Sequence, residues 1–170
     1  MVKRLLIYVL LLLTLSGCGY RFKGRAISLR GVESFNTVIV NNDTYEPELE
    51  LILRDDITTL FTTNGWLVSN ASGDDAVTFL CTVAGYKNSP ASHRSNDSIS
   101  QYEVELRFNV RVHKGPDKEK SIFSLTDRRY SELYIVSDDV NITSKNKREA
   151  IGKISDKFAR DMEDSLSQGF

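Results

Sequence analysis

The chain of 170 residues carries 22 lysines and arginines against 23 aspartates and glutamates, for a formal net charge of -1. A nucleic-acid-binding protein usually carries a strong positive excess, so this balance argues against that class. The length is sufficient for one domain with a proper hydrophobic core and too short for two domains of ordinary size.

The N-terminal segment has the pattern of a secretory signal peptide. Lys3 and Arg4 precede an apolar run over residues 5–15, and small residues end that run. A helix of this length reaches only about 16 Å, whereas the hydrocarbon core of a bilayer is about 30 Å thick. The run is therefore too short to span a membrane, and we expect residues 1–17 to be a removable signal peptide.

Cys18 directly follows this run in the sequence Leu15-Ser16-Gly17-Cys18. This sequence resembles the lipobox of bacterial lipoproteins, in which the cysteine thiol is acylated and becomes the first residue of the mature chain. The resemblance implies a covalent lipid on Cys18, and two or three acyl chains anchor a protein stably at about 0.8 kcal/mol per buried CH₂. An ordinary signal peptide that contains a cysteine near its end is the alternative.

The mature chain begins with an irregular stretch. Residues 18–35 predict a lipid-anchored tether, and residues 36–170 predict a single domain. A short β-branched run at 37–40 predicts the first, buried strand of this domain. Residues 66–68 are compatible with another short strand.

Residues 47–63 predict an amphipathic helix. Pro47 suits the first helical position, where its missing N–H costs nothing. Asn64 and Gly65 supply a C-terminal stop. Apolar residues recur at helical spacing and predict one buried face: Leu49, Ile52, Leu53, Ile57, Leu60 and Phe61.

Residues 76–86 alternate in side-chain type and predict a strand that buries Cys81. If Cys18 carries a lipid, Cys81 has no disulfide partner and acts as a small buried hydrophobe. The polar residues 87–99 that follow predict a long loop.

The clearest period-2 pattern of the chain covers residues 102–113. Its even-numbered residues are apolar and its odd-numbered residues are polar, which predicts an antiparallel strand with one packed and one wet face. Residues 121–134 predict a returning strand, whose polar second half from Asp127 onward suggests a bend. The pattern does not predict the order of the strands.

Residues 144–167 predict a second amphipathic helix, preceded by a loop at 137–141. Its apolar stripe consists of Ile151, Ile154, Phe158, Met162 and Leu166. Two such helices and a strand with one wet face predict an α+β fold. We expect a two-layer sandwich, with both helices on one face of a mostly antiparallel sheet of four to five strands.

Four stretches resemble, in chain order, the LPS-assembly lipoprotein family, LptE: CGYRF at 18–22, NDTYEPELE at 42–50, the hairpin at 86–102 and SELYIVSDD at 131–139. The resemblance implies a lipoprotein anchored in the inner leaflet of the outer membrane, on its periplasmic side. It also implies that the chain plugs the LPS-insertion β-barrel LptD, helps it assemble and takes part in delivering lipopolysaccharide to the cell surface. A lipoprotein scaffold of another cell-envelope machine is the alternative.

Nothing in the sequence predicts an enzyme. His93 and His113 are expected on the surface, and neither belongs to a spacing typical of a metal site or a catalytic group. Asp138 and Asp139 precede the second helix, where carboxylates more often cap a helix than bind a cation. We expect no catalytic residue, no metal and no cofactor other than the lipid on Cys18.

Binding to lipopolysaccharide requires cations that face its phosphates. Lys87 and Arg94 in the predicted polar loop are our candidates, with ordinary surface charge as the alternative. A barrel interior is polar, so the wet face of the clearest strand is a candidate partner surface, represented by Glu103, Arg107 and Arg111. A solvent-facing sheet is the alternative for these three residues.

Overall fold

The computed structural model describes residues 27, 29, 32–67, 76–93, 99–115 and 121–168. Cys18, the signal peptide and Arg94 lie outside the described residues. The elements in chain order are β1 (Thr37–Asn42), α2 (Leu49–Thr63), β2 (Val77–His93), β3 (Ile99–Lys114), β4 (Ser121–Ile135) and α3 (Val140–Gln168).

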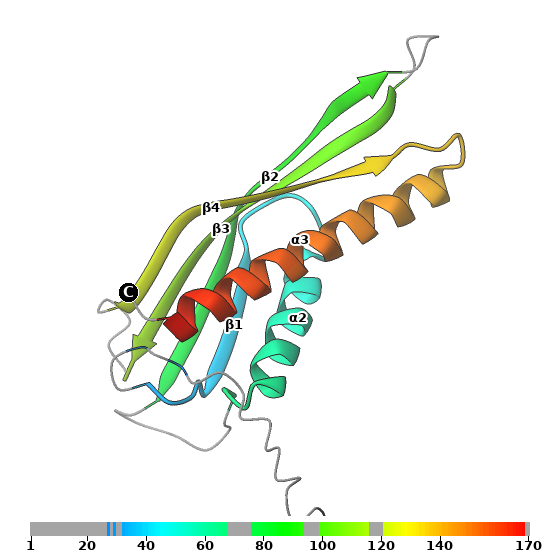
Figure 1. Cartoon of the computed structure of the whole chain (residues 1–170). Helices are drawn as coiled ribbons and strands as arrows, with labels where there is room; N and C mark the ends of the chain where they lie inside the picture. Colours follow the sequence, from blue (N-terminus) through cyan, green and yellow to red (C-terminus); the bar gives the residue numbers. More distant parts are fainter. Residues whose placement is uncertain are drawn as a thin grey trace, which may run out of the picture.

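The four strands form one sheet in the order β1-β2-β3-β4, and both helices cover the same face of it (Figure 1). The β1–β2 pair is parallel, because α2 lies in a crossover between them. The pairs β2–β3 and β3–β4 are antiparallel. The predicted α+β fold, with two helices on a mostly antiparallel sheet, is confirmed.

The core between sheet and helices contains the predicted apolar faces. All five predicted residues of the α3 stripe are at most 4% exposed. Phe108 of β3 stacks on Phe158 of α3, with 4.4 Å between ring centroids. Cys81 is fully buried, as predicted, and burial raises the pKa of its thiol to about 12.

A second aromatic cluster lies under α2. Phe35 stacks on Phe61 at 4.8 Å, and Phe61 also meets the edge of Phe79 at 4.9 Å. Phe35 belongs to the segment that we expected to act as a tether, yet it is fully buried in the core. The strand considered at 66–68 is reduced to a single bridge between Leu67 and Phe35, with Val68 outside the described residues.

The helix ends differ from prediction in two places. The first helix begins at Leu49, because Glu48 before it has a left-handed φ of 69°. Pro47 therefore lies outside the helix, and its predicted position is wrong. The second helix begins at Val140 rather than at 144. The prediction missed its first turns because their two apolar residues, Val140 and Ile142, form no stripe.

The carboxylate of Asp139 caps α3, as its position suggested. Its Oδ1 accepts the backbone N–H of Asn141 at 2.8 Å. The hydroxyl of Thr143 in turn accepts the N–H of Ser137 at 2.9 Å. These bonds satisfy backbone donors at the helix N-terminus.

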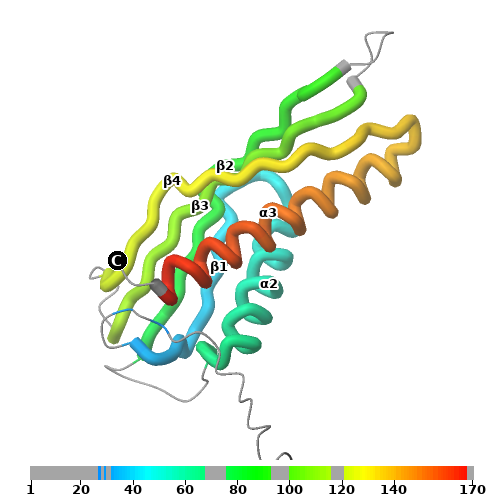
Figure 2. The backbone as a smooth tube through the Cα atoms, viewed as in Figure 1, coloured from blue at the N-terminus to red at the C-terminus, as the bar shows by residue number. Residues whose placement is uncertain are grey.

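The long polar loop predicted at 87–99 is wrong. β2 continues to His93 and pairs with β3, which begins at Ile99. Residues 87–92 of β2 are exposed or half-buried, and both strands extend beyond β1 and α2 (Figure 2). We call residues 86–93 and 99–106 the hairpin arm.

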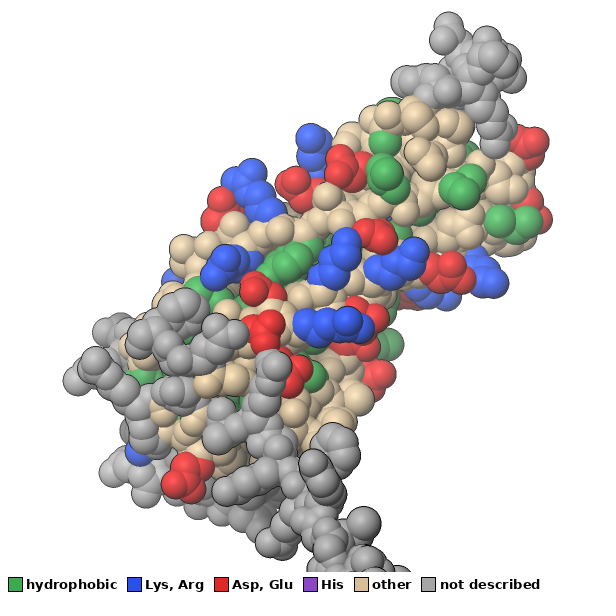
Figure 3. All heavy atoms as spheres, in the orientation of Figure 1, with side chains coloured by type: hydrophobic (Ala, Val, Ile, Leu, Met, Phe, Trp, Pro, Cys, Tyr) green, Lys and Arg blue, Asp and Glu red, His purple; other side chains and the backbone are tan. Residues whose placement is uncertain are grey.

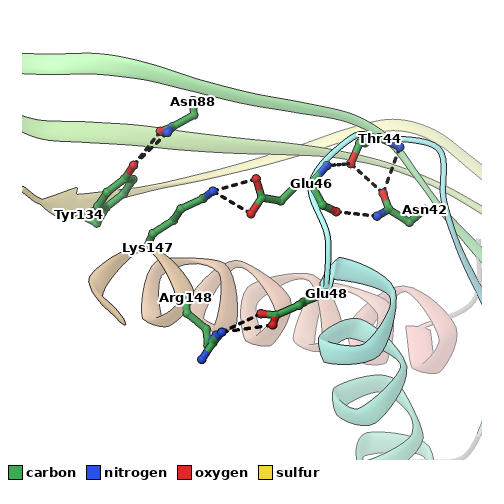
Figure 4. Close-up of polar contacts among 8 residues, drawn as sticks. All are labelled: Asn42, Thr44, Glu46, Glu48, Asn88, Tyr134, Lys147 and Arg148. Carbon is green, nitrogen blue, oxygen red and sulfur yellow. Dashed lines mark hydrogen bonds and ion pairs between the residues drawn. The ribbon is translucent and has the colours of Figure 1, made fainter. Parts of the chain in front are cut away.

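A strap, residues 42–48, connects β1 to α2 and contains most of the NDTYEPELE stretch (Figure 4). Asn42 shapes it from within. Its Oδ1 accepts the N–H and the hydroxyl of Thr44 at 3.0 and 2.7 Å, and its Nδ2 donates to the carbonyl of Glu46 at 2.8 Å. The side chain thus supplies the hydrogen bonds that the turning backbone lacks.

Two cations of α3 bind the strap. Lys147 donates to both carboxylate oxygens of Glu46, at 2.7 and 2.8 Å, and its Nζ lies 5.3 Å from the ring centroid of Tyr86 in the arm. Burial opposes the charge of Lys147, but its hydrogen bonds to Glu46 and Tyr86 outweigh burial and raise its pKa. Arg148 pairs with Glu48 at 2.9 Å. The strap therefore joins β1, α2, α3 and the arm.

We predict that Phe158→Ala lowers the free energy of unfolding by about 3–5 kcal/mol, because it leaves a cavity against Phe108. Urea denaturation measures this change. Leu51→Ala on α2, where the side chain is 66% exposed, is the control and should stay within about 0.5 kcal/mol. Equal losses in both variants would contradict the assignment of the core.

We also predict that Lys147→Ala lowers the free energy of unfolding by about 1–3 kcal/mol, because the carboxylate of Glu46 loses its partner at a half-buried position. Lys145→Ala is the matched control, since Lys145 pairs with Glu149 at 3.8 Å where both side chains are exposed. It should cost less than about 0.5 kcal/mol. A Glu46→Gln change should make Lys147→Ala less costly, and additive losses would argue against direct coupling.

Candidate functional site

No described helix packs on the second face of the sheet, which we call the open face. The alternation predicted for β3 is confirmed from Glu103 to Val112: the residues toward the helices are buried, and those toward the open face are exposed or half-buried. The open-face residues of β3 are Glu103, Glu105, Arg107, Asn109 and Arg111. The three residues predicted as a partner surface therefore share one accessible face.

Lys87 lies on this same face. It stands directly opposite Glu105 in the β2–β3 ladder, in the arm rather than in a loop. The structure thus brings Lys87 next to the candidate partner residues. Arg94, its predicted companion, lies outside the described residues.

A shallow hollow of about 220 Å³ opens beside Lys87. It is lined by Gly85, Tyr86, Lys87, Glu105 and Arg107. Lys87 and Arg107 offer positive charges to a ligand or partner, and Glu105 offers a negative one. Hydrogen bonds that involve a charged group are stronger than those between neutral groups.

A charged cluster that the sequence did not predict surrounds Asp127 on the open face. Arg129 donates from Nε and Nη2 to Asp127 Oδ2, at 3.2 and 2.7 Å. Arg107 Nε lies 3.8 Å from Asp127 Oδ1. The hydrogen bond from Arg129, together with the charges of both arginines, lowers the pKa of Asp127 and keeps this carboxylate ionised.

The second half of β4, where we predicted a bend, contains a β-bulge at the same aspartate. The register shifts opposite Phe108 and Val110, and Asp127 has a φ of 57°. Its N–H donates to Asn109 Oδ1 at 3.0 Å. The sequence signal was the sudden polarity of Asp127-Arg128-Arg129, but the pairing with Arg107 depends on register and could not be derived from it.

His113 is only 6% exposed, so its predicted surface position is wrong. It lies in the sheet between Thr78 of β2 and Ser121 of β4, and neighbouring strands on both sides reduce its exposure. The side chain of His93 is outside the described residues. Among the described residues, no group of three or more metal-ligating side chains is placed to hold an ion.

Exposed apolar side chains gather where β4 leads into α3. Leu133 and Ile135 are 52% and 60% exposed, and Val140 and Ile142 are 76% and 48% exposed. Leu133 pairs with Glu103 of the arm, so this apolar end adjoins the arm. Figure 3 shows hydrophobic side chains at this end of the molecule and interspersed charges along α3. The strand and helix periods did not predict this patch, because it forms across a turn.

The helices of the described part of the chain include none that is long and apolar enough to cross a membrane. No curated protein sequence matches the chain at a significant level. Among solved structures, an uncharacterized lipoprotein B from Nitrosomonas europaea has a TM-score of 0.55 at 13% identity, over 89% of this chain and 90% of that one. A lipoprotein from Caulobacter crescentus has a TM-score of 0.51 at 11% identity, over 76% and 88%.

At such identities the likeness to these structures shows the fold alone. The sequence model of the LptE family, described as lipopolysaccharide-assembly, matches residues 35–166. This match runs from buried Phe35 to Leu166, the last residue of the α3 stripe, and so includes every strand and the apolar faces of both helices. The chain therefore belongs to the LptE family of lipopolysaccharide-assembly proteins.

Proposed function

We propose that this chain is an outer-membrane lipoprotein that sits inside the LPS-insertion β-barrel LptD, helps it assemble and takes part in delivering lipopolysaccharide to the cell surface. The family match over residues 35–166 carries the proposal. Cys18 is the lipid-bearing residue, and the anchor lies in the periplasmic leaflet of the outer membrane. The resemblance of Leu15-Ser16-Gly17-Cys18 to a lipobox supports this placement.

The open face suits a partner that is polar and curved around the chain. Its side chains carry both charges and are exposed or half-buried from Glu103 to Arg111 of β3. The interior of a membrane barrel is polar, so such a wall can face the surface to which Glu103, Arg107 and Arg111 belong. We propose this surface as the one that faces the barrel.

The edges of the sheet near the arm favour docking by side chains over docking by strand addition. Pro90 interrupts the β2 edge, since proline has no N–H to offer a further strand. On the β4 edge, Asn146 of α3 donates to the carbonyl of Ile135 at 2.9 Å. Lys157 reaches the carbonyl of Ser131 at 3.4 Å. The chain can therefore enter a barrel without adding a strand to its wall.

The arm and the apolar end suit an amphiphile with phosphates and acyl chains. Lys87 of β2 offers a cation near the hollow, and the exposed side chains of Leu133 and Ile135 lie on β4, on the other side of β3. Lipopolysaccharide has both kinds of group. We assign its phosphates to Lys87 and Arg94 and its apolar part to the end where β4 meets α3.

The proposal predicts which complex the chain is isolated with. Capture of the full chain from detergent-solubilised outer membranes should recover a large β-barrel protein that transports lipopolysaccharide. Depletion of the chain should reduce lipopolysaccharide at the cell surface. Cys18→Ser is the control for anchoring and should leave the membrane fraction. Consistent recovery of another envelope complex without the barrel would support the scaffold alternative instead.

Charge reversal tests the proposed phosphate contacts. Lys87→Glu and Arg94→Glu should each weaken binding of purified lipopolysaccharide about tenfold or more, because a hydrogen bond between charged groups contributes about 1.5–3 kcal/mol. Lys114→Glu, at the opposite end of β3, is the matched control and should bind as the parent does. Unchanged affinity in both test variants would overturn the assignment.

A further inference from the structure

The sheet changes direction at one level, where bulges in two strands flank β3. In β2 the register shifts between Val83 and Gly85, and in β4 it shifts opposite the pair Phe108 and Val110. A bulge bends its strand and increases the local twist. Both bulges adjoin the same stretch of β3, and the strands turn there before the arm begins (Figure 2).

Arg107 lies between the two bulges on the open face. Its Nη2 donates to the carbonyl of Ala84 in the β2 bulge at 3.2 Å. Its Nε lies 3.8 Å from Oδ1 of Asp127 in the β4 bulge. The other carboxylate oxygen of Asp127 is held by Arg129. One guanidinium group therefore connects the two places where the sheet bends.

Gly85 allows the guanidinium to lie on the β2 bulge. A Cβ at this residue would lie 2.8 Å from Arg107 Nε, closer than real Cβ atoms come, and 3.0 Å from Nη2. The backbone of Gly85 is outside the left-handed region, which Gly65 and Gly115 occupy among the described glycines. What the position requires is the absence of a side chain, not backbone freedom.

The opposite face of the same stretch is packed against α3. Phe108, the next residue of β3, is fully buried and stacks on Phe158 of α3. The strand is thus held from the core side by α3 while Arg107 holds its neighbours on the open side. The arm beyond Gly85 has no β1 beside it, because β1 pairs with β2 only as far as Val83.

We propose that Arg107 is a positioning residue. Its guanidinium contacts both bulges, and these contacts set the direction of the hairpin arm. Its guanidinium is engaged within the sheet, and its contribution to docking is indirect, through the placement of Lys87 and the rest of the arm. The consequence for partner binding rests on the proposed function. The direction of the arm does not.

Gly85→Ala separates positioning from charge. The new Cβ displaces the far end of a flexible side chain, so the fold can survive while the positive charge of Arg107 remains. Arg107→Ala removes both the contacts with the two bulges and the positive charge. Arg111→Ala is the matched control, because Arg111 is another exposed arginine on the open face of β3.

The direction of the arm can be measured in the full chain in detergent by pulsed electron paramagnetic resonance. Spin labels are attached to cysteines introduced at Ala91 in the arm and at Thr59 on α2, both exposed. The parent chain without these cysteines controls for labelling of Cys18 and the buried Cys81. Thermal unfolding followed by circular dichroism confirms that each variant is folded.

Gly85→Ala and Arg107→Ala should both shift or broaden the label-to-label distance by several ångström, and Arg111→Ala should leave it unchanged. Capture of the barrel should fall by a similar factor in the first two variants. An unchanged distance in both would overturn the proposal. So would loss of capture in Arg107→Ala alone with an unmoved arm, because that result makes Arg107 a docking residue. If no barrel is captured by the parent chain, the proposed function fails and the distances still decide this inference.

Discussion

The stack of Phe108 on Phe158 fixes the sheet against its long helix at the level where the neighbouring strands bulge. The alternation of β3 requires that the residue beside a buried aromatic faces the open side, which is where Arg107 lies. Packing on one face and polar contacts on the other therefore meet at one point of one strand. The core depends on the packing of Phe108, and the direction of the arm depends on the contacts of Arg107.

The strap adds polar contacts that connect α3 to the arm. Lys147 holds Glu46 and lies over Tyr86, so helix, strap and arm meet at one cation. The stretch NDTYEPELE carries part of the family resemblance and also has a structural role. Its asparagine and threonine shape the turn, and its first two glutamates bind α3.

Much of the fold was predictable because burial imposes a period. The alternation in β3 and the helical stripes of α2 and α3 appear in the order of the residues themselves. Residues 87–99 were mistaken for a loop, since few of their side chains are apolar and residues 87–93 form a strand only through the ladder with β3. His113 was misplaced for a related reason, because its burial depends on flanking strands. At the candidate site, the open-face residues followed from alternation, whereas the hollow and the apolar end did not.

The sequence by itself determined the class of fold, the wet face of β3 and the lipobox resemblance at Cys18, because each depends on residues close together in the chain. Tertiary structure alone decided that Ala84, Arg107 and Asp127 meet. These residues lie on three strands, and their meeting depends on two register shifts that no local pattern records. Contacts between distant segments arise from register and packing, so the contacts of Arg107 with the two bulges are visible only in the folded sheet.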